Sequence, residues 1–209
     1  MSPAEALLGF TAAAAVLTVL PGLDTALVLR AAAVEGSKRA TLAGLGIAIG
    51  CLVWGAAAAV GLGALLAASH LAFTLLKWAG AAYLLWLGIG LISRPRKTFD
   101  MEAVEGAPIG DDFAWMRRGL TTNLLNPKIG VFYVSFLPQF MAQGVPAGPF
   151  LFLLAAVHAS IGMIWFALLI AAMAPIARTL KRPAVVTWLD RLTGGVFVAF
   201  AARLALEKA

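Results

Sequence analysis

The sequence has few charged residues for its length. Only 12% of its 209 residues are Asp, Glu, Lys or Arg, whereas 62% are hydrophobic, and the mean hydropathy is +0.93. Charged residues make up about 25% of an average soluble domain. Two runs, 40–76 and 129–177, contain none of the four charged types. Each run exceeds the ~20 residues that a membrane-spanning helix needs, so the composition predicts an integral membrane protein.

Cysteine is also scarce, because Cys51 is the only one. The chain therefore forms no intramolecular disulfide and has no dithiol pair, which excludes a membrane thiol–disulfide carrier. We expect Cys51 to pack as a small apolar residue. The sequence lacks a zinc motif such as H-E-x-x-H, which argues against a membrane-embedded hydrolase. We expect no enzymatic activity and no cofactor. We also expect no nucleic-acid partner, because the excess positive charge falls in the loops between spans, as the positive-inside rule predicts.

The apolar segments are expected to be helices, because Gly, Ala and Leu dominate them and strand-type alternation is absent. We predict an all-α membrane protein with six transmembrane helices, over residues 5–29, 41–68, 72–92, 118–142, 148–175 and 185–206. Most Lys and Arg residues fall in three connections, 30–40, 93–117 and 176–184, and the two alternate connections have none. The positive-inside rule therefore predicts that these three loops are cytoplasmic and that both termini are outside.

Proline interrupts two of the predicted spans beside polar residues. The first span contains Pro21-Gly22-Leu23-Asp24-Thr25, and the fourth contains Asn123-Leu124-Leu125-Asn126-Pro127-Lys128. Proline has no N–H and its ring clashes with the preceding turn, so each helix should break there. In a bilayer the freed backbone groups need partners, and intramembrane ionisable residues are candidates for function. The alternative for the fourth span is a proline kink with Lys128 snorkelling to the interface.

The two halves of the chain repeat in outline. Pro21 corresponds to Pro127, and Lys77-x-x-Gly80-x-x-Tyr83 corresponds to Arg191-x-x-Gly194-x-x-Phe197. Because each half has three spans, the halves must cross the membrane in opposite directions. This pattern predicts two inverted three-helix repeats, 1–92 and 118–209, joined by a cytoplasmic linker, 93–117. In transporters of this plan the substrate site lies where the repeats meet, near the middle of the membrane.

Three segments carry a family resemblance. Residues 21–30 (PGLDTALVLR) are similar to the first-helix signature of the lysine exporter and homoserine/threonine exporter family (LysE/RhtB type). Residues 123–128 with 136–140 (NLLNPK and FLPQF) resemble its fourth-helix signature, and residues 76–84 (LKWAGAAYL) resemble its third helix. The resemblance implies a small exporter of amino acids or close derivatives in the bacterial inner (plasma) membrane, driven by the proton gradient. The family commonly has a second proline where this chain has Leu23.

An amino-acid zwitterion needs an anion site and a cation site close together. Half-helix N-termini near the two prolines can offer unpaired N–H groups to a carboxylate, and Lys128 can add a positive charge. Asp24 can bind the ammonium group or carry the exchanged proton, and the two amides can serve either end. We predict eight substrate-binding residues: Pro21, Gly22, Asp24, Thr25, Asn123, Asn126, Pro127 and Lys128.

Several alternatives remain open from sequence alone. Asp24 can instead cap the half-helix after Pro21, or form an ion pair with Lys128 that joins the halves. His158 in the fifth span fits hydrogen-bonded packing, with a proton relay as the alternative. A metal-ion or other small-solute exporter is the rival function, with Asp24 and His158 as its few candidate ligands. The expected partners are the amino acid, protons and membrane lipids, and a homodimer is left open.

Overall fold

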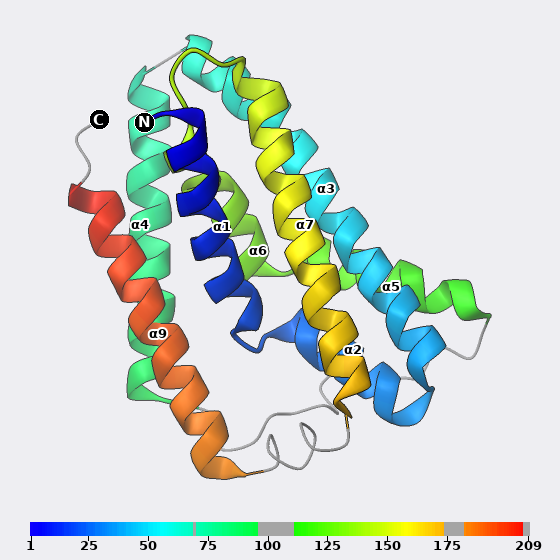
Figure 1. Cartoon of the computed structure of the whole chain (residues 1–209). Coiled ribbons are helices and arrows are strands. Elements are labelled where there is room, and N and C mark those ends of the chain that lie inside the picture. Colours follow the sequence, from blue (N-terminus) through cyan, green and yellow to red (C-terminus); the bar gives the residue numbers. More distant parts are fainter. Residues whose placement is uncertain (69, 96–110, 174–181, 207–209) are drawn as a thin grey trace.

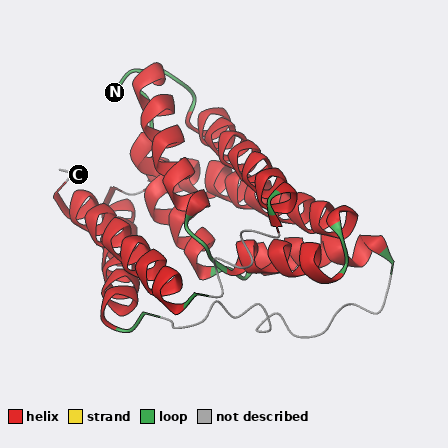
Figure 2. Cartoon of the chain, turned by 60° about the horizontal axis from the view of Figure 1, so that its bottom comes forward, coloured by secondary structure: helices red, strands yellow, loops and turns green. Residues whose placement is uncertain are grey.

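The computed structural model describes residues 1–68, 70–95, 111–173 and 182–206. Every regular element in these ranges is helical, which confirms the predicted all-α class for this part of the chain (Figures 1 and 2). The elements are α1 (Pro3–Val19), α2 (Leu23–Val34), α3 (Ser37–Ala68), α4 (His70–Ser93), α5 (Asp112–Leu124), α6 (Pro127–Val131), the π-helix η1 (Phe132–Phe136), the 3-10 helix η2 (Leu137–Phe140), α7 (Ala147–Ala171) and α9 (Pro183–Leu206). Most of the predicted linker 93–117 and of the loop 176–184 lies outside the described residues.

The first predicted break is present. A capping box starts α1, in which Ser2 and Glu5 each accept a hydrogen bond from the other's backbone N–H. The helix ends at Val19, two residues before Pro21, and α2 begins at Leu23. The two helix axes differ in direction by 53°. The predicted span 5–29 is therefore two helices joined at the proline.

The second predicted break is also present. Asn126 caps α6, because its side-chain oxygen accepts a hydrogen bond from the backbone N–H of Lys128 at 3.1 Å. The helix before the break starts at Asp112 instead of 118, because the side chain of Asp111 caps it through the N–H of Ala114. The remainder of the predicted span is less regular than expected. It passes through the π-helix η1 and the 3-10 helix η2, where Pro138 lacks the N–H that a continuous α-helix needs.

Helices from the two halves of the chain pack against each other. The most extensive contacts join α3 to α7, α3 to α5 and α4 to α9. Glycine allows close approach, because a Cβ added to Gly46 of α3 would lie 1.9 Å from the carbonyl oxygen of Met116 in α5. A Cβ added to Gly194 of α9 would lie 2.5 Å from the carbonyl oxygen of Gly88 in α4. Glycines of α3 such as Gly46 therefore serve close helix packing, as their composition indicates.

Some of the described helices have the length and composition of membrane spans. Two of them, Ser37–Gly61 within α3 and Ala147–Ala171, are long and apolar enough to cross a membrane, and the bent pair α1–α2 would make a third. Large apolar side chains such as Val60, Trp86 and Ile164 are exposed on the outer faces of the bundle. Such apolar surface is unfavourable in contact with water, whereas the lipid of a bilayer can cover it. The chain is a multi-pass membrane protein.

The ends of the helices fall into two groups (Figure 1). The start of α1, the end of α3 and the starts of α4 and α7 lie at one end of the bundle. The N–H of Gln143 donates to the carbonyl oxygen of Met1 there, at 3.2 Å. The α2–α3 connection, the ends of α4 and α7 and the start of α9 lie at the opposite end.

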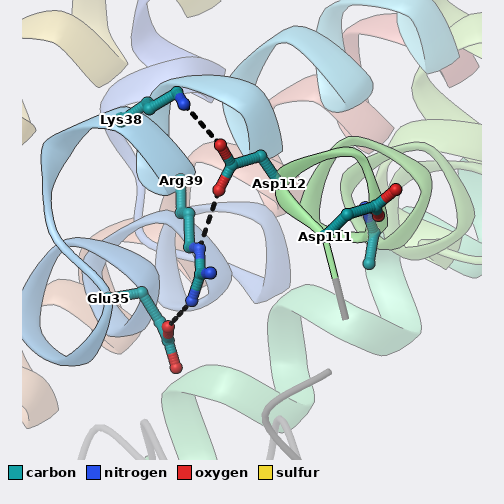
Figure 3. Close-up of polar contacts among 6 residues, drawn as sticks. Glu35, Lys38, Arg39, Asp111 and Asp112 are labelled. Atoms are coloured by element: carbon teal, nitrogen blue, oxygen red, sulfur yellow. Dashed lines mark hydrogen bonds and ion pairs between the residues drawn. The ribbon is translucent and has the colours of Figure 1, made fainter. Parts of the chain in front are cut away.

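Charged residues join the start of α5 to the start of α3 and the end of α2 (Figure 3). Asp112 pairs with Lys38, and it accepts a hydrogen bond from Nε of Arg39 at 3.0 Å. Arg39 also pairs with Glu35, one helical turn earlier. Lys38 and then Arg39 hold the pKa of Asp112 below its usual range. Solvent-exposed ion pairs contribute little to stability, so the cluster orients the start of α5 more than it stabilises the fold.

Candidate functional site

The two helix breaks lie against each other and exchange polar contacts. The α5–α6 break supplies the side chains of Asn123, Asn126 and Lys128. The α1–α2 break supplies the carboxylate of Asp24 and the backbone carbonyls at the end of α1. Backbone irregularity inside a membrane protein is tolerated where protein or a cavity satisfies the freed groups. Here each break satisfies groups of the other.

Asp24 is held by two amides. Its carboxylate oxygens accept hydrogen bonds from Nδ2 of Asn123 at 2.8 Å and from Nδ2 of Asn126 at 3.1 Å. All three side chains are buried. Hydrogen bonds to an ionised acceptor are roughly twice as strong as neutral ones, so they can offset part of the cost of burying the carboxylate. The alternative that Asp24 caps α2 is wrong, because Gly22 is the N-cap and no side chain caps that helix.

Lys128 binds the end of α1. Its ammonium group donates to the carbonyl oxygen of Leu20 at 3.1 Å and to that of Leu17 at 3.4 Å. In a continuous helix the carbonyl of Leu17 would accept from the N–H of residue 21, but that residue is proline. The positive charge also suits the negative end of the helix dipole. Lys128 is therefore directed into the first break, and the snorkelling alternative does not describe its side chain.

A cavity of about 30 Å³ adjoins these contacts. It has room for one or two water molecules and is smaller than an amino acid. The polar side chains that line it include Asp24, Thr25, Lys128 and His158. The structure thus brings three of the eight predicted site residues to the cavity wall.

The other five predicted residues are not among the described residues that line the cavity, but they position those that do. Asn123 and Asn126 hold the carboxylate of Asp24, and neither is among the described residues that line the cavity. Pro21 and Pro127 produce the two breaks. Gly22 makes room for the ammonium group, because a Cβ added there would lie 3.0 Å from Nζ of Lys128.

His158 is hydrogen-bonded to a residue that sequence reasoning missed. Its Nδ1 lies 3.0 Å from the hydroxyl oxygen of Tyr133, and both side chains are buried. Tyr133 belongs to the π-helix η1, and a tyrosine in an apolar segment gives no sequence signal apart from the nearby Pro138. The predicted hydrogen-bonded packing of His158 is therefore present. The same histidine also lines the cavity, which keeps the relay alternative open.

Cys51 packs in the interior as predicted, but at the edge of the site. It is 5% exposed, lines the cavity, and its Sγ lies 3.6 Å from Nδ2 of Asn123. The Oδ1 atom of Asn123 is buried and has no hydrogen-bond partner within the described part of the chain. Gly50 makes room for this amide, because a Cβ added there would lie 2.5 Å from that oxygen.

The arrangement places an acidic and a basic side chain in the wall of one small cavity, with two amides behind the acidic one. No group of three His, Cys, Asp or Glu side chains that could hold a metal ion is found within the described ranges. The charged pair suits the two ends of a zwitterion, with hydrogen-bonding groups nearby for orientation.

Comparisons with known proteins place the chain in a family. The sequence profile described as "LysE type translocator" matches residues 15–208. An uncharacterized membrane protein of Vibrio cholerae is 32% identical over 202 residues, which cover 97% of each chain. A leucine efflux protein of Klebsiella pneumoniae is 32% identical over 200 residues, covering 95% of this chain and 93% of that one. A leucine efflux protein of Enterobacter sp. is 32% identical over 191 residues, covering 90% of each.

No solved structure shows a significant match to the chain. The profile match spans nearly the whole length, and it includes both helix breaks and the residues that meet between them. The chain belongs to the LysE type translocator family.

Proposed function

We propose that this protein exports amino acids or close derivatives across the inner (plasma) membrane by proton antiport. The observation that carries the proposal is the cavity where the two breaks meet, with Asp24 and Lys128 in its wall. The family consists of translocators, and two relatives are named leucine efflux proteins. In the proposed complex, Lys128 binds the substrate carboxylate.

The proposed binding reaction exchanges protein contacts for substrate contacts. Lys128 now donates to carbonyls of α1, and a carboxylate is a stronger acceptor for the same ammonium group. Asp24 faces the same cavity and can bind the substrate ammonium group or take up the antiported proton. Because the cavity is smaller than an amino acid, substrate must enter a more open state in which the breaks have moved apart.

The proposed architecture is six spans in two inverted repeats. The packing of α3 on α7 and of α4 on α9 supports it, because these are the corresponding helices of the two halves. The breaks at Pro21 and Pro127 also correspond. Transporters of this plan bind substrate at the repeat interface, and interrupted helices supply the binding groups. Asp24 and Lys128 come from opposite halves, so relative motion of the halves would alter the site.

The topology is tested with reporter fusions. We expect reporters fused after residue 37 and after residue 105 both to report the cytoplasm, because the basic connections 30–40 and 93–117 should stay inside. The α2–α3 connection and the end of α4 lie at the same end of the bundle, which supports the expectation (Figure 1). A fusion after residue 145, in a connection without Lys or Arg, should report the outside. If either of the first two reports the outside, the proposed topology fails.

The transport activity is tested by measuring amino acids inside and outside cells with and without the protein. We expect the protein to lower the intracellular level and raise the extracellular level of at least one amino acid. An uncoupler that collapses the proton gradient should abolish the difference if protons drive export. Unchanged levels for every amino acid, with the protein present in the membrane, would contradict the proposed function. Export that persists without a proton gradient would contradict antiport alone.

A further inference from the structure

Most of the cavity wall is apolar, and its polar side chains on the described part of the chain are Thr18, Asp24, Thr25, Lys128 and His158. On the described part of the chain its charged residues are Asp24 and Lys128, and His158 is its one imidazole. The remaining wall includes large and small apolar residues from α3, α6 and α7: Ile47, Ala48, Ile129, Ala159, Gly162 and Phe166. The cavity therefore combines one pair of opposite charges with an apolar surface.

The apolar surface continues in one direction along α7. His158, Gly162 and Phe166 are spaced four residues apart, so they lie on one face of the helix. The distance from the first to the last is about 12 Å along the helix axis. On α3, Cys51 and Ile47 are also four residues apart, and α3 runs in the opposite direction to α7 (Figure 1). The wall thus changes from polar at His158 to apolar at Phe166.

Gly162 lies in the middle of this apolar face and leaves it open. A Cβ added to Gly162 would meet no described atom within 4 Å. Beyond it, the ring of Phe166 lies over Gly44 of α3, where an added Cβ would be 3.2 Å from the ring. The wall beside Gly162 is therefore not filled by described atoms, with Phe166 at its far end, and it is the part of the wall that a substrate side chain would contact in the more open state.

The charges of the wall limit what this space can bind. The carboxylate and ammonium groups of an amino acid would occupy Lys128 and Asp24, and no further charged residue lines the described cavity. A lysine or arginine side chain would then bury a charge without a partner, which is costly. An aliphatic side chain would instead gain from leaving water.

The geometry points to a side-chain subsite for neutral aliphatic amino acids, formed by Ile47, Gly162 and Phe166, in which Gly162 sets the largest side chain that fits. This inference rests on the proposed function. It names the substrate class of the same site. One methylene group in an apolar pocket changes specificity by about 10–200-fold, so filling the space at residue 162 should discriminate among substrates by size.

The test uses the purified full-length protein in proteoliposomes. Counterflow of labelled leucine, alanine and lysine is measured for the wild type and for Gly162→Val. We expect the wild type to carry leucine well and lysine poorly. In Gly162→Val the ratio of leucine flux to alanine flux should fall about tenfold or more, because the added methyl groups occupy the space of the larger side chain. Gly162→Ala should lower the ratio less, and it provides the test if the valine variant does not fold.

Gly195→Val is the matched control. Gly195 is exposed on α9, an added Cβ there also meets nothing within 4 Å, and it is not among the described residues that line the cavity. This variant should keep the wild-type flux ratio. If leucine and alanine fluxes change alike in both Gly162 variants, or if the wild type carries lysine as well as leucine, the subsite is overturned while amino-acid transport stands. If the wild type carries no amino acid, the proposed function itself fails, and the subsite fails with it.

Discussion

Lys128→Met should reduce transport by about two orders of magnitude while the protein remains in the membrane. Methionine has a similar length but no charge. It cannot bind a substrate carboxylate or the carbonyls of Leu17 and Leu20. A hydrogen bond to a charged group contributes about 1.5–3 kcal/mol, so losing one such bond to the substrate corresponds to about one to two orders of magnitude, and the full charge-assisted contact lies at the upper end of that range. The measurement is the initial rate of counterflow in proteoliposomes, normalised to the amount of protein.

Two further variants separate charge from geometry at this position. Lys128→Arg keeps the charge, but we expect impaired transport because the planar guanidinium is larger than the ammonium group, which already packs closely against Gly22. Gly22→Ala keeps Lys128 and crowds its ammonium group, so transport should fall less than in Lys128→Met. The extended backbone at Gly22, with φ of −142°, allows alanine there.

Lys38→Met is the matched control for Lys128→Met. Lys38 is an exposed lysine in the charged cluster with Asp112, and its side chain is 78% exposed. Losing one exposed ion pair changes stability little, so transport should stay near the wild-type rate. If Lys128→Met transports normally at normal protein levels, Lys128 has no role in binding the substrate.

Both helix breaks were predictable from local covalent chemistry. Pro21 and Pro127 remove an N–H and clash with the preceding turn whatever the tertiary structure is. Asp24 and Lys128 stood out because ionisable residues are rare in membrane spans. The sequence therefore identified the segments that meet at the cavity, although it did not show how they contact each other.

The contacts themselves were not predictable, because half of them involve the backbone. Lys128 binds the carbonyls of Leu17 and Leu20, and every residue has a carbonyl, so no side-chain pattern marks these two. Tyr133 was missed for a different reason. Its hydrogen bond with His158 depends on the π-helix η1. A π-helix has a wider turn than an α-helix, so the α-helical spacing of the sequence does not show which face of the helix a side chain occupies.

The sequence left open which groups Asn123 and Asn126 bind. As amides they can donate or accept, so they fitted direct substrate binding. In the structure both donate to Asp24, which gives the buried carboxylate its hydrogen-bond partners. Which group an amide binds depends on packing across 99 residues of sequence, and this cannot be derived from local spacing.

Asp24→Asn should stop net uphill export. The substitution removes the charge and the titratable proton and keeps the shape of the side chain. We expect the protein to fold, because Asn123 can turn its amide so that Oδ1 accepts from the amide introduced at position 24. That oxygen has no partner in the described structure. After the turn it would take the place of Nδ2, which lies 3.6 Å from Sγ of Cys51, and the thiol can act as a weak donor. The measurement is export against a concentration gradient, driven by an imposed pH gradient across proteoliposomes.

Counterflow of labelled substrate by the same variant decides which role Asp24 has. If Asp24 carries the antiported proton, exchange persists without it, because substrate still binds and the site still alternates between the two sides. If Asp24 binds the substrate ammonium group, exchange stops as well, because the buried cation has lost its partner. Asp112→Asn is the matched control and should leave both activities near the wild-type level, because Asp112 lies in the exposed charged cluster. Should Asp24→Asn export uphill at the wild-type rate and still respond to the pH gradient, Asp24 serves neither role, and its hydrogen bonds to Asn123 and Asn126 only join the two breaks.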